Sequence, residues 1–308
     1  MRWCCFSILL IGIGIQAVGS SSAGAPSFLV VSQSSVVAPQ PSTVAPQPSA
    51  DGSWLEAPLE EGQAVLWHLF HSGFAVRTAN HLLIFDYWPA NKTKEKKPGL
   101  ADGRIDPEEL ADQNVIVFIS HEHHDHWYRK SLEWQRRVKN IHYVVSTEVS
   151  RDDEDYGPPG VTTLAANTTI RIKGLAIRTL LSTDSGVAFL VDVDGLTIYH
   201  SGDHAAWNWD ADARADTVFV EEQLAPLRGR KIDIAMHVCD PRLGASGWGG
   251  FFAFARRFQP GLMVPMHLKG KYGVTSRVES LFADLGLPVT LWPVKGPGDR
   301  IRYPAGTD

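Results

Sequence analysis

The sequence predicts an α/β protein in which two β-sheets pack against each other and helices cover their outer faces. The chain has 308 residues, 44% of them hydrophobic, so it can bury one large core or two small ones. From residue 54 onward, about a dozen short apolar runs are separated by turn residues, and the later runs alternate with segments of helical spacing. This order of strands and helices over about 255 residues favours two sheets with external helices.

Residues 1–19 predict a secretory signal peptide. Arg2 supplies a positive start, 6–15 is apolar, and 17–19 offers small residues for cleavage. The alternative is an uncleaved membrane anchor, but the uncharged stretch 3–18 is shorter than the roughly 20 residues that a spanning helix needs. We therefore expect a secreted or periplasmic protein without stable membrane insertion after signal removal.

Residues 20–53 predict a disordered linker. They are rich in Ser, Ala, Val and Pro, and they repeat the hexapeptide Val-Ala-Pro-Gln-Pro-Ser at 37–42 and 44–49. Proline at this density blocks helices and sheet ladders and favours extended chain. We expect a tether that carries no chemistry, followed by one folded domain over residues 54–308.

The net charge bears on the possible binding partners, and the cysteine content bears on disulfide formation. The formal net charge of −5 argues against a nucleic-acid-binding surface, which needs clustered Lys and Arg. The one basic cluster, at 92–97, lies beside Pro98 and Gly99 and predicts a solvated loop. Once the signal peptide is removed, Cys239 is the single cysteine, so no internal disulfide is expected. A small-molecule substrate is the expected partner, and the oligomeric state stays open.

Apolar and β-branched runs place the strands of the domain. Asp194-Gly195 is a two-residue hairpin signal, and Ala79-Asn80 joins the second predicted strand to the third. The predicted strands are 64–70, 74–78, 81–85, 114–119, 141–145, 169–173, 176–181, 187–193, 196–199, 232–236, 262–264, 289–294 and 300–303. Helical spacing is found at 131–138, 251–258 and 276–285.

The densest polar cluster follows the buried strand predicted at 114–119. The stretch Ser120-His121-Glu122-His123-His124-Asp125-His126-Trp127 puts four histidines and two carboxylates into six consecutive positions. Burying that many ionisable groups without partners would cost several kcal/mol each. The cluster therefore predicts a metal site at the end of a strand.

The spacing within the cluster suggests two ions. Alternate residues of an extended segment point to one side, so His121 and His123 can present imidazoles to one ion. Asp125 and His126 are neighbours that diverge, which would let them address a second ion nearby. In an extended segment His124 points to the side opposite His121 and His123, so we do not expect it to bind the ion.

Two later strands also end in potential ligands. The apolar run 196–199 leads into His200-Ser201-Gly202-Asp203-His204, and the run 262–266 leads into His267. A lone His or Asp after a strand is more often a cap or turn residue. Three such strand ends in one chain favour convergence on one site.

These residues resemble the metallo-β-lactamase fold superfamily. The resemblance rests on Asp86 after 82–85, the cluster 121–126, Ser201-Gly202-Asp203 and Pro265-Met266-His267, in this order from about residue 62 onward. The stretches 69–74, 182–189 and 240–242 look like a less characterised bacterial metallo-hydrolase branch. The resemblance implies a four-layer αβ/βα sandwich with a metal site at one edge of two mixed sheets, and a hydrolase domain over 54–308.

The resemblance also implies a ligand set for two metals. His121 and His123 would bind the first, Asp125, His126 and His267 the second, and Asp203 would bridge both. Asp86 would hold the ligating residues in place without binding a metal itself.

One departure from the family pattern concerns the first metal. The superfamily usually supplies a third histidine ahead of the bridging aspartate, whereas no histidine lies between His142 and His200 here. By position, Asp184 is the candidate replacement, and the alternative is a turn residue beside Gly186. An added carboxylate would shift the preference from zinc towards manganese or iron without deciding it.

The sequence allows two different roles for each of two further residues, His71 and Arg242. His71 could reach the metals, as a similarly placed histidine does in related hydrolases, or it could be a structural residue at a strand end. Arg242 could bind an anionic substrate group or pair with an acid.

Metal-assisted hydrolysis is the predicted chemistry, on an ester, lactone or phosphodiester type of substrate. One or two divalent ions, zinc with manganese or iron as alternatives, would activate water, and Asp125 or Asp203 would position it. The chain has no Gly-x-Ser-x-Gly elbow, so a serine nucleophile is unsupported. The rival hypotheses are a non-catalytic metal-binding protein of the cell envelope and, with less support, a di-iron oxidoreductase.

Overall fold

The structure is a computed structural model that describes residues 54–89, 98–149, 160–207 and 220–304. The expected signal peptide, the linker and the basic cluster at 92–97 lie outside these residues. Within them, no helix has both the length and the apolar character that a membrane crossing requires.

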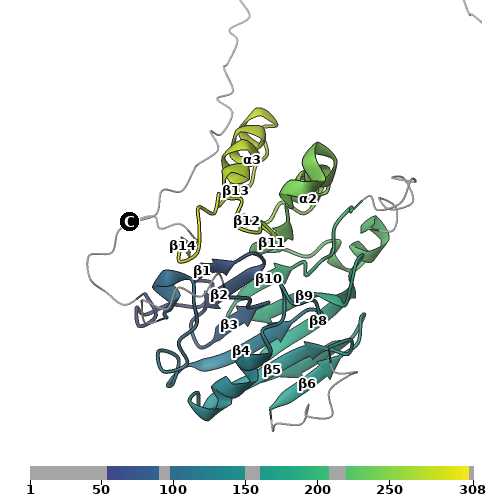
Figure 1. The fold of residues 1–308 in the computed structure, drawn as a ribbon. Helices are drawn as coiled ribbons and strands as arrows, with labels where there is room; N and C mark the ends of the chain where they lie inside the picture. The colour runs from purple at the N-terminus through teal and green to yellow at the C-terminus, as the bar shows by residue number, and fades with distance from the viewer. Residues whose placement is uncertain (1–53, 90–97, 150–159, 208–219, 305–308) are drawn as a thin grey trace, which may run out of the picture. The chain divides into compact units, whose positions relative to one another are not determined.

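Two seven-stranded mixed sheets form the centre of the fold (Figure 1). The first sheet contains β1 (Ala64–Phe70), β2 (Gly73–Arg77), β3 (Leu82–Phe85), β4 (Asn114–Ile119), β5 (Asn140–Ser146), β6 (Val161–Leu164) and β14 (Arg300–Tyr303). Its order is β14-β1-β2-β3-β4-β5-β6. Pairing is antiparallel from β14 to β3 and parallel from β3 to β6.

The second sheet has the same mixed character. It contains β7 (Thr169–Ile172), β8 (Leu175–Leu181), β9 (Val187–Val193), β10 (Leu196–His200), β11 (Ile234–Val238), β12 (Leu262–Met266) and β13 (Thr290–Leu291). Its order is β13-β12-β11-β10-β9-β8-β7, parallel from β10 to β13 and antiparallel from β7 to β10.

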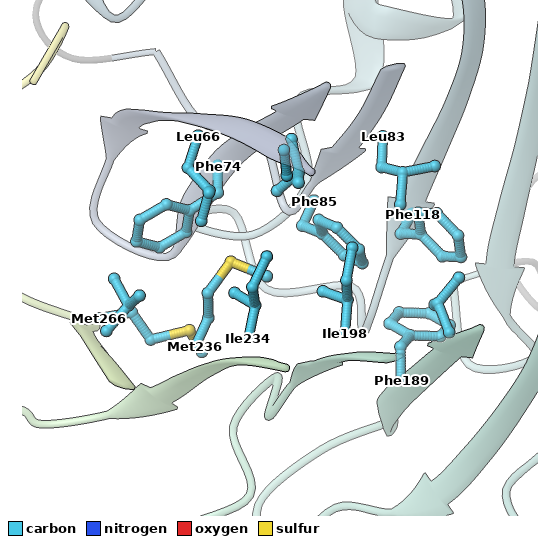
Figure 2. Packing of buried hydrophobic residues seen from close by; sticks show 14 of the residues in the cluster. Leu66, Phe74, Leu83, Phe85, Phe118, Phe189, Ile198, Ile234, Met236 and Met266 are labelled. Atoms are coloured by element: carbon cyan, nitrogen blue, oxygen red, sulfur yellow. The ribbon is translucent and has the colours of Figure 1, made fainter. Parts of the chain in front are cut away.

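Apolar side chains from the two sheets pack face to face (Figure 2). Phe118 of the first sheet stacks on Phe85 with ring centroids 4.6 Å apart, and it meets Phe189 of the second sheet edge-on at 5.1 Å. Every residue of β4 after Asn114 is buried because the sheet is covered on both faces. This burial explains why the strand is a continuous apolar run.

Helices cover the outer faces and complete four layers. On the second sheet lie α2 (Gly244–Phe258) and α3 (Gly273–Asp284), whose Phe254 and Phe282 belong to one cluster with Tyr199 of β10. On the first sheet, the 3-10 turns η1 (Leu100–Asp102) and η2 (Arg129–Arg136) join a separate apolar cluster. Two further 3-10 turns, η3 (Ala225–Leu227) and η4 (Pro241–Leu243), lie before β11 and α2. The predicted αβ/βα sandwich is confirmed.

Three elements differ from the predictions. The segment predicted as a helix at 131–138 forms the 3-10 turns of η2, and the strand β6 was not predicted because its VTTL sequence is half exposed and has no clear alternation. The strand predicted at 289–294 pairs only at Thr290–Leu291. Pro293 lacks the N–H that a longer ladder would use.

Candidate metal centre

The loops that follow β1, β3, β4, β10 and β12 meet at one edge of the two sheets. Each carries a buried polar side chain that sequence reasoning had singled out. These residues are His71 after β1, Asp86 after β3, His121, Asp125 and His126 after β4, Asp203 after β10, and His267 after β12. Strand ends thus bring residues that lie up to 196 positions apart, from 71 to 267, into one site.

The first group of ligand atoms contains His121, His123 and Asp203, with all atoms within 4.8 Å of one another. His121 Nε2 lies 3.4 Å from Asp203 Oδ2 and 3.0 Å from His123 Nδ1. The side chain of His123 is 45% exposed, so this group opens to solvent. Such a group can hold a metal ion and admit a small molecule beside it.

The second group contains His71, Asp125, His126 and His267, all of them buried. The other oxygen of Asp203, Oδ1, lies 3.1 Å from His126 Nε2 and 3.3 Å from His267 Nε2. Asp203 therefore directs one carboxylate oxygen towards each group, as expected of a bridging residue. His71, which the sequence left open, lies in this second group.

Buried polar atoms without hydrogen-bond partners indicate that the centre requires a bound cation. His71 Nε2, His126 Nε2 and Asp203 Oδ1 are buried, and they have no hydrogen-bond partner within the described residues. Although His126 Nε2 and Asp203 Oδ1 are 3.1 Å apart, the geometry is not that of a hydrogen bond. Leaving a buried polar atom without a hydrogen bond costs folding free energy. A cation between the two atoms would satisfy both, and imidazole with carboxylate is a donor set that suits divalent metals.

Asp86 orients His126 from the side that faces away from the centre. It accepts hydrogen bonds from the Ser120 N–H at 2.8 Å, from Ser120 Oγ at 2.6 Å and from His126 Nδ1 at 2.8 Å. Burial alone would raise the pKa of Asp86, but the hydrogen bond from His126 and the neighbouring histidines lower it. Asp86 is therefore a carboxylate that fixes the ring of His126, the supporting role that the family resemblance implied.

The charge around His126 is unusual. Burial alone would lower the pKa of His126, whereas the carboxylates of Asp203 and Asp86 raise it to about 10. Without a metal ion, a proton on His126 therefore stands between two carboxylates. A metal ion must displace that proton when it binds.

His267 has its own supporting carboxylate, which sequence reasoning missed. His267 Nδ1 lies 2.6 Å from Asp240 Oδ2, and Arg242 clamps the same carboxylate through Nε at 2.9 Å and Nη2 at 2.6 Å. Burial would raise the pKa of Asp240, but these two partners lower it. Arg242 thus pairs with an acid, one of its two predicted alternatives. The signal for Asp240 was its position four residues after the end of the strand predicted at 232–236.

Lys269 is a second residue that the sequence did not single out. Its Nζ lies 3.0 Å from Asp125 Oδ2, and His71 Nε2 lies 3.4 Å from the same oxygen. Burial would raise the pKa of Asp125, while His71 and Lys269 lower it. The only available signal was that Lys269 lies two positions after a strand-end histidine.

Asp184 and His124 remain at the periphery. Asp184 is exposed and belongs to none of the groups of ligand atoms in the described part of the chain. Hydrogen bonding to Asp203 is the main cause of the raised pKa of His123, and the charge of Asp184 adds to it. Ligation by Asp184 stays a prediction. His124 is exposed, meets Trp88 edge-on at 5.7 Å and belongs to none of the groups of ligand atoms among the described residues.

Two glycines let the loops of the centre pack closely. The Val187 N–H donates to the Ser120 carbonyl at 3.0 Å, and a Cβ at Gly186 would collide with that carbonyl. A Cβ at Gly202 would come within 3.0 Å of the Ser120 side chain. Both glycines have positive φ, 62° and 53°, which favours residues without a side chain.

Non-glycine residues in the left-handed region also gather here. The φ values are 55° at His71, 39° at Asp86, 67° at His267 and 46° at Lys269. Such conformations cost about 1 kcal/mol or more each and persist where the surrounding structure holds them. Their clustering sets this edge apart as a functional site.

Comparison with known proteins agrees with this geometry. Residues 66–267 match the model of a family described as the beta-lactamase superfamily domain. A comparison with curated protein sequences found no match to the chain.

Solved structures share the fold at low sequence identity. Igni18, a metallo hydrolase from the archaeon Ignicoccus hospitalis, is 19% identical with a TM-score of 0.55, covering 78% of this chain and 98% of that chain. YhfI from Bacillus subtilis, a metallo-beta-lactamase fold protein, is 14% identical with a TM-score of 0.53 and covers 78% and 99%. CmlA from Streptomyces venezuelae, a diiron beta-hydroxylase, is 13% identical with a TM-score of 0.52 and covers 80% and 54%.

The family match spans the strands and loops that build the centre, from β1 to His267. The likeness to solved structures concerns the same two-sheet sandwich. The chain therefore belongs to the beta-lactamase superfamily and has the metallo-β-lactamase fold.

Proposed function

We propose that the protein is a metal-dependent hydrolase that acts on a small molecule with an ester, lactone or phosphodiester bond. The observation that carries this proposal is the buried pair of His126 Nε2 and Asp203 Oδ1, which lie 3.1 Å apart and have no hydrogen-bond partners within the described residues. Family membership and metallo-hydrolase neighbours of the same fold support it.

In this proposal each of the two groups would hold one metal ion. His121 and His123 would hold one ion, His126, His267 and Asp125 would hold the other, and Asp203 would be a ligand shared by both. A bound divalent ion would lower the pKa of water to about 7 and polarise the carbonyl or phosphoryl oxygen under attack. Asp86 and Asp240 keep the rings of His126 and His267 fixed while this happens.

Asp125 and Asp203 are the proposed catalytic carboxylates that position the attacking water. Both are nearly buried, 6% and 3% exposed, so their orientation is set by protein partners and not by solvent. A cysteine nucleophile is unsupported, because Cys239 is buried and burial raises the pKa of its thiol.

The proposed metal is zinc, with manganese or iron as alternatives. Both groups offer only nitrogen and oxygen donors. Such donors bind zinc, and a larger share of carboxylate favours harder ions. Elemental analysis of the purified protein decides among them.

The test of the hydrolase proposal combines metal content with a substrate panel. The purified protein would be assayed against esters, lactones and phosphodiesters, before and after removal of metal by a chelator. Hydrolysis that is lost on chelation and restored by one metal is expected. A fully metal-loaded protein that turns over no substrate class favours the non-catalytic metal-binding alternative.

A di-iron oxidoreductase is the second candidate. It is favoured by the bridging position of Asp203 between two groups of nitrogen and oxygen donors, and by the likeness in fold to a diiron beta-hydroxylase. Iron as the bound metal, together with oxygen consumption in the presence of a reductant, would favour this candidate over hydrolysis.

We also propose that the protein works outside the cytoplasm, in the periplasm or as a secreted protein. The support is the signal-like pattern of residues 1–19. Mass spectrometry of the protein from the exported fraction should find a mature chain that starts near residue 20. Full-length protein retained in the cytoplasm would contradict the proposal.

A further inference from the structure

His71 lies among residues that could all hold one ion, together with Asp125, His126 and His267. Distance alone cannot separate ligands from other residues in such a group. The separation follows from the hydrogen bond that each imidazole makes through the nitrogen that faces away from the centre. A neutral imidazole has one N–H and one lone pair, so a bond at one nitrogen fixes the state of the other.

Three histidines turn Nε2, the nitrogen that can bind metal, towards the centre. His126 Nδ1 and His267 Nδ1 each face a carboxylate oxygen, of Asp86 at 2.8 Å and of Asp240 at 2.6 Å. A carboxylate only accepts, so both histidines carry the proton on Nδ1. Nε2 is then the atom of each ring that can bind metal, at His126 once the metal displaces the proton that the neighbouring carboxylates favour.

His121 follows the same rule through a hydroxyl group. The single proton of Ser120 Oγ is directed to Asp86 at 2.6 Å, so Oγ must accept from His121 Nδ1 at 2.9 Å. His121 Nε2 therefore also presents a lone pair to the centre.

His71 has the opposite arrangement. The backbone N–H of Lys269 donates to His71 Nδ1 at 3.2 Å. A backbone N–H cannot accept, so Nδ1 holds the lone pair and the proton must be on Nε2. Nε2 is buried and faces the second group, where Asp125 Oδ2 lies 3.4 Å away. That contact lacks hydrogen-bond geometry, so Nε2 has no hydrogen-bond partner among the described residues.

The backbone and two rings hold His71 in this state. The His267 N–H donates to the His71 carbonyl at 3.1 Å, and the His71 ring lies 4.0 Å from the His267 ring and 5.7 Å from Trp88, centroid to centroid. Turning the ring over would place a carbon atom against the Lys269 N–H and break the hydrogen bond that Nδ1 accepts.

We propose that His71 is not a metal ligand but a hydrogen-bond donor, whose Nε2–H binds an oxygen atom of the substrate beside the metal held by His126 and His267. The identity of that oxygen rests on the proposed hydrolase function, whereas the state of the ring does not. In this role His71 stabilises negative charge that develops on the substrate oxygen as water attacks.

The state of the ring can be measured in the wild-type protein. Nitrogen-15 NMR of the zinc-loaded full chain reports, for each histidine, which ring nitrogen carries a proton and which is bound to zinc. We expect a proton on Nε2 of His71 and on Nδ1 of His126 and His267. A zinc-bound Nε2 at His71 would overturn the proposal.

Matched substitutions test the same point through metal content. His71→Gln keeps an N–H near the position of Nε2, His71→Ala removes it, and His267→Gln changes a histidine that also has positive φ. We expect zinc content equal to wild type in both His71 variants and loss of one zinc in His267→Gln. Loss of zinc from His71→Gln to the extent seen in His267→Gln would contradict the donor role.

Inorganic phosphate is the probe for the donated hydrogen bond. Phosphate should bind the zinc-loaded wild type and His71→Gln alike, and about ten- to a hundredfold more weakly to His71→Ala, the range for a hydrogen bond to a charged group. Equal affinity of all three proteins, or no binding to the wild type, would argue against the proposal. None of these readouts needs turnover, so a failure here is distinct from a failure of the hydrolase proposal.

Discussion

At the scale of single residues, the centre depends on the partners behind its histidines. Asp86 faces His126, Asp240 faces His267, and each contact fixes both the ring and the position of its proton. Within the part of the chain that the structure describes, His126 Nε2 and Asp203 Oδ1 are left without hydrogen-bond partners. Metal affinity should therefore depend on residues that do not touch the metal.

Replacing Asp86 by Asn should weaken metal binding while leaving the ligands in place. The amide cannot accept from Ser120 and His126 as the carboxylate does, so the ring of His126 loses its orientation. We expect zinc affinity to fall about 10- to 100-fold in competition with a chromogenic chelator. Asp233→Asn is the control, because Asp233 is also buried and accepts a backbone N–H, from Thr197 at 2.9 Å, outside the centre. Equal zinc affinities of the two variants would count against the role of Asp86.

Zinc affinity should rise with pH. Zinc needs neutral His126, and the neighbouring carboxylates raise the pKa of His126 to about 10, so a proton competes with the metal below that pH. Apparent affinity is expected to increase up to about tenfold per pH unit between pH 7 and 9, with proton release seen by calorimetry in buffers of different ionisation heat. In Asp86→Asn the rise should level off at lower pH. A zinc affinity independent of pH would contradict this assignment.

The sequence predicted part of this centre. The spacing His-x-His-x-Asp-His and two later strand ends were enough to predict His121, Asp125, His126, Asp203 and His267 as neighbours. Asp240 and Lys269 were missed, and the role of His71 stayed open. Their contribution depends on which nitrogen faces which neighbour across separate loops, and no local pattern encodes that.

At the scale of elements, close contact between loops holds the ligands in place. Gly186 between β8 and β9 and Gly202 after β10 both pack on Ser120, the first residue of the histidine cluster. The β4 loop is thus held from the second sheet, and a side chain at either glycine would push the two sheets' loops apart.

Gly186→Ala should lower both stability and zinc content. The new Cβ meets the Ser120 carbonyl, and φ of 62° adds backbone strain. We expect a loss of more than about 2 kcal/mol in the free energy of unfolding, measured with urea, as overpacking adds to strain.

The matched control is Gly229→Ala. Gly229 also has a positive φ, 72°, but a Cβ there meets nothing within 4 Å. Only the strain of about 1 kcal/mol is expected, with unchanged zinc content. Similar losses in both variants would show that contact with Ser120 is unimportant.

Elements with a strong pattern were predicted well. The bounds of β1, β9 and β14 agree with the runs 64–70, 187–193 and 300–303. The β6 strand and the 3-10 turns of η2 were not predicted as such, because their structure depends on tertiary packing more than on periodicity.

At the scale of the whole molecule, the two sheets are joined by packing and by a polar link away from the centre. Asp194, in the β9–β10 turn, accepts hydrogen bonds from Thr78 Oγ1 at 2.6 Å, from the Asn80 N–H at 2.8 Å and from His81 Nδ1 at 3.0 Å. Those three residues lie between β2 and β3 of the other sheet. Burial would raise the pKa of Asp194, but these hydrogen bonds lower it to about 2.

Asp194→Ala should destabilise the domain by about 1–3 kcal/mol without changing zinc content, since several donors lose a charged acceptor. Because the pKa is lowered, the contribution of Asp194 is present above pH 4 and is lost as the pH falls through about 2. Urea unfolding at neutral pH measures the loss. Asp112→Ala is the control, since Asp112 is 90% exposed in a loose pair with Lys139, and the two variants should differ clearly.

The fold class could be predicted because its determinants are distributed along the chain. Runs buried on both faces, such as β4, indicate sheets covered from both sides, and α2 and α3 lie near the predicted helical segments. The order of strands within each sheet was not predicted. That order depends on crossovers between distant segments, as in the parallel pairing of β3 with β4 across 28 intervening residues.

The most direct test of the central claim is the metal content of the purified full-length protein and of three single variants, His121→Ala, Asp203→Ala and His267→Ala. The two groups of ligand atoms predict one or two divalent ions per wild-type chain and the loss of most of that metal in each variant. Metal content that is unchanged in all three folded variants would contradict the assignment of the centre.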